Sequence, residues 1–192
     1  MAKSQDSYRS LLRVIMETQP RPSKRSLSTA FERNFIRERI DCDEVYPGIF
    51  IGDGMTATTK EYLKSIGITH VINTAQGHKI AQVDTNEHYY STSGIKFLGL
   101  RLMDTPGTNI SVHFDECADF IDEALNKGGN VFVHCYMGIS RSATIVLAYL
   151  MLRKGFTAED AIRTVRIHRD VTPNNGFLQQ LFELNIRLHK KH

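Results

Sequence analysis

A buried strand, a short loop and an apolar helix follow one another between residues 131 and 151. The run Val131-Phe132-Val133 has the β-branched and aromatic residues that are typical of a buried strand. Residues 142–151 contain no charged side chain and predict a helix that is buried on every side. The nine residues His134–Ser142 join the two, so this loop leaves the end of a strand and opens onto a helix N-terminus. Such a unit predicts an α/β fold with its ligand site at the loop.

The loop has the residues of a phosphate-binding thiolate site, with a cysteine and an arginine nearby. Backbone N–H groups at a helix N-terminus converge on an anion, and the helix dipole favours negative charge there. One such anion is the Cys135 thiolate: a thiol of pKa about 8.5 is about 3% ionised at pH 7, whereas one of pKa about 6 is about 90% ionised. The other is a substrate phosphoryl group, held by Arg141, whose planar fork fits phosphate. The phosphate-binding residues are predicted to be Tyr136, Met137, Gly138, Ile139, Ser140 and Arg141.

Attack of a thiolate on phosphorus requires an acid that protonates the leaving oxygen. Asp104 is the candidate, because it follows a strand-like segment and lies in a turn-rich stretch with Pro106 and Gly107. Asp104 would then act as a base toward the water that hydrolyses the phospho-cysteine. Ser142, or alternatively Ser140, would donate a hydrogen bond to the departing thiolate. This chemistry needs no metal and no cofactor.

The chain resembles the dual-specificity protein phosphatases of the cysteine-based tyrosine phosphatase superfamily, and most of all their small atypical members of the VHR type. The resemblance covers roughly residues 42–190, and beyond the loop it rests on Asp104 and on the segments Gly67–Asn73, Ala148–Met151 and Pro173–Leu178. It implies that Cys135 is the nucleophile, Arg141 the phosphate clamp, Asp104 the general acid and Ser142 the thiolate helper. It also implies that Asn175 braces the phosphate loop and that Arg169 lies near a secondary phosphate pocket.

Several of these residues also have simpler interpretations. An isolated buried cysteine often serves only in packing, and an aspartate such as Asp104 is common in turns. His134 invites a Cys–His dyad, but adjacent residues of a strand point to opposite faces, which favours a role in shaping the loop. Arg169 lies near a predicted helix end, where a cation interacts favourably with the dipole. Each of these alternatives makes the residue structural rather than functional.

Composition places the chain among ordinary globular proteins, with 41% hydrophobic and 23% charged residues. Its three cysteines, Cys42, Cys117 and Cys135, have unrelated spacings, which argues against a disulfide framework or a zinc site and for a reducing compartment. Neither a signal peptide nor an apolar run of transmembrane length is found. We therefore expect a cytoplasmic or nuclear location, or both, without stable membrane insertion.

The first 40 residues differ from the rest in charge. They carry a net charge of +5, whereas residues 41–192 carry −2. Apolar residues recur at helical spacing between Tyr8 and Met16, Pro20 and Pro22 interrupt the pattern, and Phe31–Ile40 is again helix-like. We expect a basic helical extension over residues 1–40 and a catalytic domain over 41–192. The extension would pad the catalytic body, serve as an arm for partner docking or dimerisation, or, as a minor alternative because its charge density is modest, bind a membrane surface.

The catalytic part alternates short β-branched runs with amphipathic helices. Strands are predicted near residues 48–52, 69–74, 96–100 and 130–134, and helices near 57–66, 111–127, 141–154, 157–168 and 174–189. The expected fold is a single α/β domain. Its central twisted, mostly parallel sheet would be flanked by helices, with the phosphate-binding loop between a central strand and a helix.

The loop composition narrows the substrate class. The resemblance implies phosphorylated proteins, with MAP kinases among them, dephosphorylated at both phosphotyrosine and phosphoserine or phosphothreonine. Phosphoinositide phosphatases of the superfamily place lysines inside the loop, whereas Tyr136, Met137 and Ile139 are uncharged. The catalytic part also has no dense basic patch for a nucleic acid. Two alternatives remain: a catalytically weak scaffold that binds phosphoproteins, and a phosphatase for a non-protein phosphate ester.

Overall fold

The computed structural model describes residues 7–21 and 40–189, and its centre is a five-stranded sheet. The strands are β1 (Cys42–Tyr46), β2 (Ile49–Gly52), β3 (Ile68–Asn73), β4 (Lys96–Gly99) and β5 (Asn130–His134). They lie in the order β1-β2-β5-β3-β4, in which β1 pairs with β2 antiparallel and all other neighbours are parallel. The mostly parallel sheet is confirmed, and the edge strand β1 is the one that the sequence did not predict.

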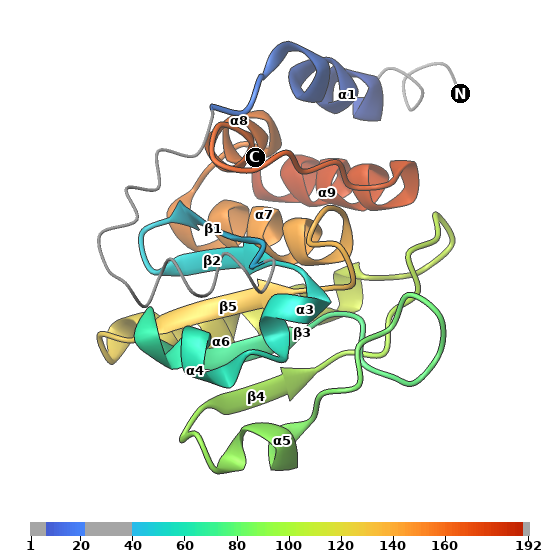
Figure 1. The fold of residues 1–192 in the computed structure, drawn as a ribbon. Helices are drawn as coiled ribbons and strands as arrows, with labels where there is room; N and C mark the ends of the chain where they lie inside the picture. Colours follow the sequence, from blue (N-terminus) through green and yellow to red (C-terminus); the bar gives the residue numbers. More distant parts are fainter. Residues whose placement is uncertain (1–6, 22–39, 190–192) are drawn as a thin grey trace.

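Helices cover both faces of the sheet (Figure 1). They are α1 (Ser7–Glu17), α3 (Gly54–Ala57), α4 (Lys60–Ser65), α5 (Glu87–Ser91), the 3-10 turn η2 (Ser111–His113), α6 (Phe114–Asn126), α7 (Arg141–Lys154), α8 (Ala158–Arg166) and α9 (Asn175–His189). The predicted helix at 57–66 is in fact two short helices, α3 and α4. Within the described part of the chain, no helix has the length and apolar character required to cross a membrane.

Alternating residues of the strands supply two separate apolar cores. Ile51 and Val133 point to the face covered by α6 and α7, whereas Phe50 and Phe132 point to the face that carries α4 and α5. Residues 141–151 of α7 are all buried, so the prediction of a fully buried helix is confirmed. The parallel strands β2, β3 and β5 end at the same level, with Gly52 and Asn73 each paired with His134. The loop after β5 therefore leaves the carboxyl edge of the sheet.

The N-terminal helix α1 packs against α8 and α9 and forms the outermost layer of the structure (Figure 1). Leu11, Val14 and Ile15 are buried in the same core as α7. The Nε of Arg166 donates to the carbonyl oxygens of Ile15 at 2.7 Å and Thr18 at 2.9 Å, which satisfies carbonyl groups at the end of α1. The apolar face of α1 is thus used inside the chain. The second predicted segment, 31–40, lies outside the described residues except for its last residue.

Candidate active site

The loop between β5 and α7 holds the predicted nucleophile at its base. Cys135 follows the last residue of β5 and is only 1% exposed. Its Sγ accepts hydrogen bonds from the backbone N–H of Gly138 at 3.2 Å and from the hydroxyl of Ser142 at 3.5 Å. The sulfur is therefore surrounded by donors, as a thiolate requires.

Two opposing effects act on the Cys135 thiol. Burial raises its pKa, whereas the hydroxyl and backbone N–H of Ser142, the charge of Arg141 and the backbone N–H of Ile139 lower it. The net effect is a pKa below the ordinary value of a cysteine. By contrast, burial raises the pKa of the Cys117 thiol to about 12, and the charge of Glu116 adds to this shift. The loop thus favours the thiolate at Cys135 specifically.

The loop can close around the sulfur because residue 138 is a glycine. Gly138 has φ of +68°, in the left-handed region. A Cβ atom at this position would lie 2.5 Å from the carbonyl oxygen of Gly52 and 2.6 Å from Nη2 of Arg169. Both the backbone conformation and the space around it therefore exclude a side chain.

Arg141 is buried at the start of α7 and is held by backbone carbonyl groups. Its Nη1 donates to Leu102 at 3.0 Å and its Nη2 to Ala81 at 3.1 Å. Ala81 itself has φ of +61°, an uncommon conformation for a residue other than glycine. The Nε of Arg141 lies 3.5 Å from Oδ2 of Asp104 but makes no hydrogen bond within the described part of the chain. One buried, charged donor beside Cys135 is therefore left for a ligand.

Asp104 lies at the mouth of the loop, on the connection that follows β4. Its Oδ1 accepts hydrogen bonds from the Ser140 hydroxyl at 2.7 Å and from Nδ2 of Asn174 at 2.9 Å. Its side chain is one-third exposed, so it remains accessible to a substrate. The structure thus brings Asp104 to the loop across 36 residues of sequence, where the general acid was predicted. The Ser140 hydroxyl is engaged with Asp104, which leaves Ser142 as the hydroxyl that contacts the sulfur.

The residue that braces the loop is Asn174, and the prediction of Asn175 was wrong by one position. The backbone N–H of Asn174 donates to the Ser140 hydroxyl at 3.2 Å, and its side chain reaches Asp104. Asn174 also precedes α9 and accepts a hydrogen bond from the backbone N–H of Phe177 at 3.1 Å. Asn175 is already the first residue of that helix. The helix start therefore places one asparagine toward the loop and turns the next away from these contacts.

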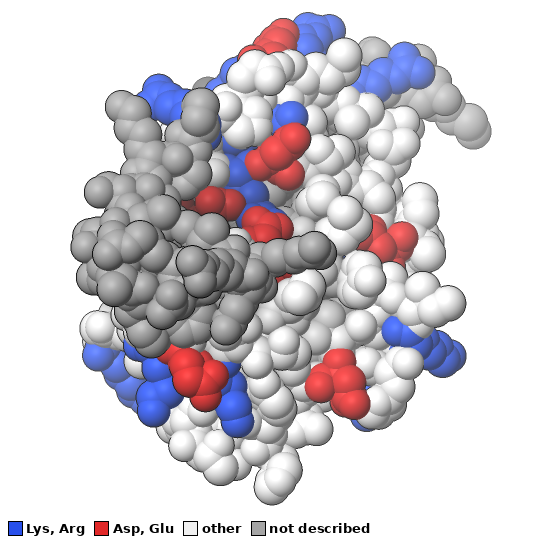
Figure 2. Space-filling model, viewed as in Figure 1, with Lys and Arg blue, Asp and Glu red and all other residues white. Residues whose placement is uncertain are grey.

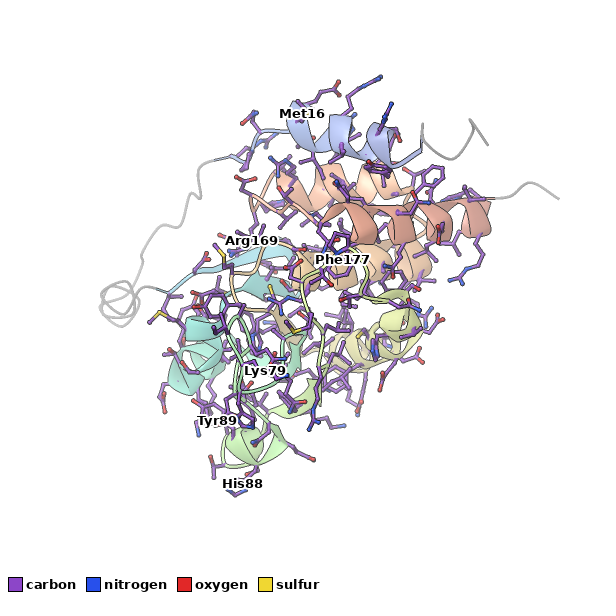
Figure 3. The ribbon with its side chains drawn as sticks, turned by 90° about the vertical axis from the view of Figure 1, so that its right-hand side faces the viewer. Met16, Lys79, His88, Tyr89, Arg169 and Phe177 are labelled. Carbon is purple, nitrogen blue, oxygen red and sulfur yellow. The ribbon has the colours of Figure 1, made fainter. Side chains whose placement is uncertain are left out.

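Arg169 braces the loop from behind rather than facing a substrate. Its side chain is 7% exposed and lies where the connection after α8 meets the N-terminal strands (Figure 3). It donates to the carbonyl oxygens of Gly138 at 2.8 Å and Met137 at 3.1 Å. The remaining three bonds go to Asp41 and Asp43, at 2.6 to 2.8 Å. All five N–H groups of the guanidinium donate hydrogen bonds, so Arg169 has no free donor for the second phosphate that was predicted near it.

His134 shapes the loop, as the strand geometry predicted. Its Nδ1 lies 3.1 Å from the carbonyl oxygen of Cys135, and its ring stacks on Phe132. Burial lowers its pKa to about 4, while the bond to the Cys135 backbone opposes that shift and the charge of Arg141 adds to it. A neutral, fully buried imidazole of this kind holds the backbone of the nucleophile in place.

The upper residues of the loop face solvent and a cavity. Tyr136 is 52% and Met137 58% exposed, although both are large apolar side chains. Together with Ile139 they line a cavity of about 730 Å³ beside the loop. Their side chains are thus accessible to a substrate, and their predicted part in phosphate binding stays a prediction.

A sequence model of the dual specificity phosphatase catalytic domain matches residues 49–187, which contain strands β2 to β5, the loop and most of α9. The chain belongs to the dual-specificity phosphatase family. Similar proteins include dual specificity protein phosphatase 26 of Mus musculus, 45% identical over 77% of this phosphatase and 69% of the relative. Dual specificity protein phosphatase 13B of Mus musculus is 47% identical over 78% of this chain and 75% of its own.

Solved structures agree with the fold of the phosphatase. The human tyrosine phosphatase-like serine/threonine/tyrosine-interacting protein superposes with a TM-score of 0.68 at 36% identity, covering 74% of this chain and 94% of that one. DUSP15 superposes with a TM-score of 0.65 at 32% identity, covering 79% and 97% of the two chains. The single α/β domain is therefore shared with known dual-specificity phosphatase structures.

Sequence reasoning missed several groups on which the phosphatase site depends. The carbonyl groups of Ala81 and Leu102 hold Arg141, and Asp41 and Asp43 hold Arg169. Every residue has a backbone carbonyl group, so residue type does not reveal which one will accept a hydrogen bond. An ion pair between residues 128 positions apart cannot be recognised from spacing. Asn174 did carry a signal, because an asparagine after a proline favours a helix N-cap.

Proposed function

We propose that the phosphatase hydrolyses phosphotyrosine and phosphoserine or phosphothreonine esters of proteins through a phospho-cysteine at Cys135. The observation that carries this proposal is the Nε–H of Arg141, which makes no hydrogen bond to any described residue and is buried beside a thiol whose pKa is lowered. A phosphoryl oxygen is the acceptor that this donor lacks. Backbone N–H groups of the loop would hold the remaining oxygens, as they now hold the sulfur.

In the first step, the Sγ of Cys135 forms a bond to phosphorus while the bond from phosphorus to the ester oxygen breaks. Asp104 gives its proton to that leaving oxygen, and the hydrogen bonds from Ser140 and Asn174 hold its carboxyl group at the mouth of the loop. A phosphoryl oxygen at the Nε of Arg141 takes the place that Oδ2 of Asp104 occupies in the free protein. Binding thus releases one oxygen of Asp104 for proton transfer.

In the second step, water attacks phosphorus and the phosphorus–sulfur bond breaks. Asp104, now ionised, accepts a proton from the water, so phosphate leaves and the acid is restored. The hydroxyl of Ser142 donates to the sulfur and stabilises it as the departing thiolate. The cycle returns Cys135 and Asp104 to their starting states without a metal ion or a redox partner.

Trapping of the intermediate tests this mechanism. Rapid acid quench of the enzyme with a ³²P-labelled phosphopeptide should give label bound to the wild-type protein and none bound to Cys135→Ser. Asp104→Asn should lower turnover most for esters with poor leaving groups, because such oxygens need the proton. Equal label on wild-type protein and Cys135→Ser would exclude Cys135 as the nucleophile.

Phosphorylated proteins are the substrates of this family. Among them we propose MAP kinases, which the resemblance implies, to be tested by dephosphorylation of the purified kinases with Cys135→Ser as control. We also propose a cytoplasmic or nuclear location, which imaging of the tagged full chain would test. Dimerisation through the N-terminal helix stays a prediction. Only its outer surface, where Met16 is 76% exposed, would be available for it.

A binding function without turnover is the second candidate, and the similarity to the human tyrosine phosphatase-like serine/threonine/tyrosine-interacting protein favours it. In this chain the Nε of Arg141 lies 3.5 Å from the Asp104 carboxylate, and the charge of Arg141 lowers the pKa of Cys135, which supports catalysis instead. Binding of phosphopeptides without phosphate release would support the scaffold. Release of phosphate only from small non-protein esters would support the remaining alternative.

A further inference from the structure

The cavity beside the catalytic loop has an unusual wall. Apolar surface comes from the loop and from Met55 and Val83. The charged residues of the wall are five aspartates and one arginine: Asp41, Asp43, Asp53, Asp84, Asp170 and Arg169. Figure 2 shows acidic side chains gathered on this face, around the place where Figure 1 draws β1. At about 730 Å³ the cavity has the volume of an ordinary ligand pocket.

Most of the charges of the wall are already paired. The guanidinium of Arg169 donates hydrogen bonds to Asp41, Asp43 and two carbonyl groups of the loop, so it offers no N–H to a ligand. Asp170 forms an ion pair with Arg166 at 2.6 Å. The cavity therefore contains no available cation among the described residues that line it, and its field is negative.

Two carboxylates of the wall, Asp53 and Asp84, form no ion pair with a lysine or an arginine of residues 7–21 or 40–189. One oxygen of Asp53 accepts a hydrogen bond from the backbone N–H of Thr56 and caps α3. Asp84 is 62% exposed, and the partner seen for it is the exposed His78 at 3.0 Å, which is charged only when protonated. Both carboxylates are thus open to a cationic ligand.

The apolar part of the wall suits the stem of a long basic side chain. Met55 is 56%, Tyr136 52% and Met137 58% exposed, although exposing such large apolar side chains to water is unfavourable. Lysine and arginine side chains lay their methylene groups on such surface and keep the charged end near carboxylates or over an aromatic ring. Tyr136 and Met137 directly follow Cys135 in sequence, so the cavity lies beside the catalytic loop, although Cys135 itself does not line it.

From these observations we propose that the cavity is a substrate subsite for a lysine or arginine that flanks the phosphorylated residue, bound by Asp53 and Asp84. The inference rests on the proposed phosphatase function and deepens it. It replaces the expected second phosphate pocket at Arg169, because a second phosphate would meet carboxylates instead of a free guanidinium. The phosphatase would thus select singly phosphorylated, basic sites.

Matched peptides test the subsite. Phosphotyrosine peptides would differ only in the flanking residue, with Lys, Gln, Glu or phosphothreonine placed in turn on either side. For wild-type protein we expect kcat/KM for the better Lys peptide to exceed that for its Glu counterpart by about tenfold, because several weak charge interactions add. The phosphothreonine peptide should be no better than the Glu peptide. The preference should shrink as salt increases, since the carboxylates are exposed.

The double variant Asp53→Asn/Asp84→Asn assigns the effect to the two carboxylates. Asparagine also caps helices, so α3 keeps its N-cap. The ratio of kcat/KM between Lys and Glu peptides should fall to about twofold. Asp115→Asn, the same change at an exposed residue of α6 outside the cavity, should leave the wild-type ratio.

A ratio near one in wild-type protein, or a ratio that survives in the double variant, would overturn the proposal. Faster turnover of the doubly phosphorylated peptide would do the same. A failure of the phosphatase function is distinguished by para-nitrophenyl phosphate, because its hydrolysis requires the catalytic loop but no flanking residue. If that hydrolysis depends on Cys135 and no peptide preference is found, only the subsite is wrong.

Discussion

The Nε of Arg169 donates a hydrogen bond to the carbonyl oxygen of Gly138 at 2.8 Å. Gly138 in turn donates its backbone N–H to the sulfur of Cys135 at 3.2 Å. The ion pairs from Asp41 and Asp43 hold the guanidinium in position. The nucleophile is thus held by a chain of contacts that begins at strand β1 and its preceding residue.

Arg169→Lys should therefore weaken both the loop and the fold. Lysine keeps the charge but cannot bond two carbonyl oxygens and two carboxylates at once. We expect kcat/KM for a small aryl phosphate to fall about tenfold and the free energy of unfolding to fall by about 1 to 2 kcal/mol. Arg187→Lys, at an exposed position of α9, is the matched control. Wild-type kinetics for Arg169→Lys would show that the loop does not need this brace.

Asn174 and Asn175 offer a direct comparison of neighbouring asparagines. Asn174→Ala removes a hydrogen bond to Asp104 and the cap of α9, so we expect about a tenfold loss of kcat/KM and about 1 kcal/mol of stability. Asn175→Ala should change both by much less. Steady-state kinetics and urea unfolding of the two variants give the answer, and the reverse ranking would restore Asn175 as the bracing residue.

The acid limb of the pH–rate profile should depend on Ser142. Turnover needs Cys135 ionised, so kcat/KM rises with pH through the pKa of this thiol. The Ser142 hydroxyl is among the groups that lower this pKa, hence Ser142→Ala should move the acid limb to higher pH. A profile of kcat/KM against pH for both proteins measures the shift. An unmoved limb would mean that the hydroxyl contributes nothing to the thiolate.

His134 should make the fold sensitive to mild acid. Its pKa is lowered from 6.5 to about 4 in the folded protein, chiefly by burial. Between these values the unfolded chain binds the proton and the folded one does not. The stabilisation is therefore complete above pH 6.5 and is lost as pH falls toward 4.

Between pH 7 and pH 5 this histidine should cost about 2 kcal/mol of unfolding free energy. Urea unfolding at both pH values should show a smaller loss in His134→Asn than in the wild-type protein. Asparagine can retain the bond to the backbone of Cys135, which limits damage to the loop. Equal losses in the two proteins would show that His134 titrates normally when folded.

Short apolar and β-branched runs predicted four of the five strands, most clearly β2 and β5, whose central residues are apolar and buried. Strand β1 escaped notice because Asp43 and Glu44 interrupt it, although Cys42 and Val45 are buried. Asp43 is acidic because it meets Arg169, a partner that lies far away in the sequence. The sequence of an edge strand that contains such charged residues therefore resembles the sequence of a loop.

In the active site, the sequence predicted the roles of residues that lie close together in one segment. Cys135, Gly138 and Arg141 lie on one loop, and their roles follow from a helix N-terminus and a thiol. Arg169 was misjudged because its charge is evident in sequence but its neutralisation by Asp41 and Asp43 is not. The same long-range pairing turned an expected phosphate pocket into an acidic cavity.

The most direct test of the central claim is phosphate release from two peptides of one sequence, carrying phosphotyrosine in one and phosphothreonine in the other. Phosphate should be released from both peptides by the wild-type protein and from neither by Cys135→Ser. Release that survives in Cys135→Ser, or no release from either peptide with wild-type protein, would contradict that claim.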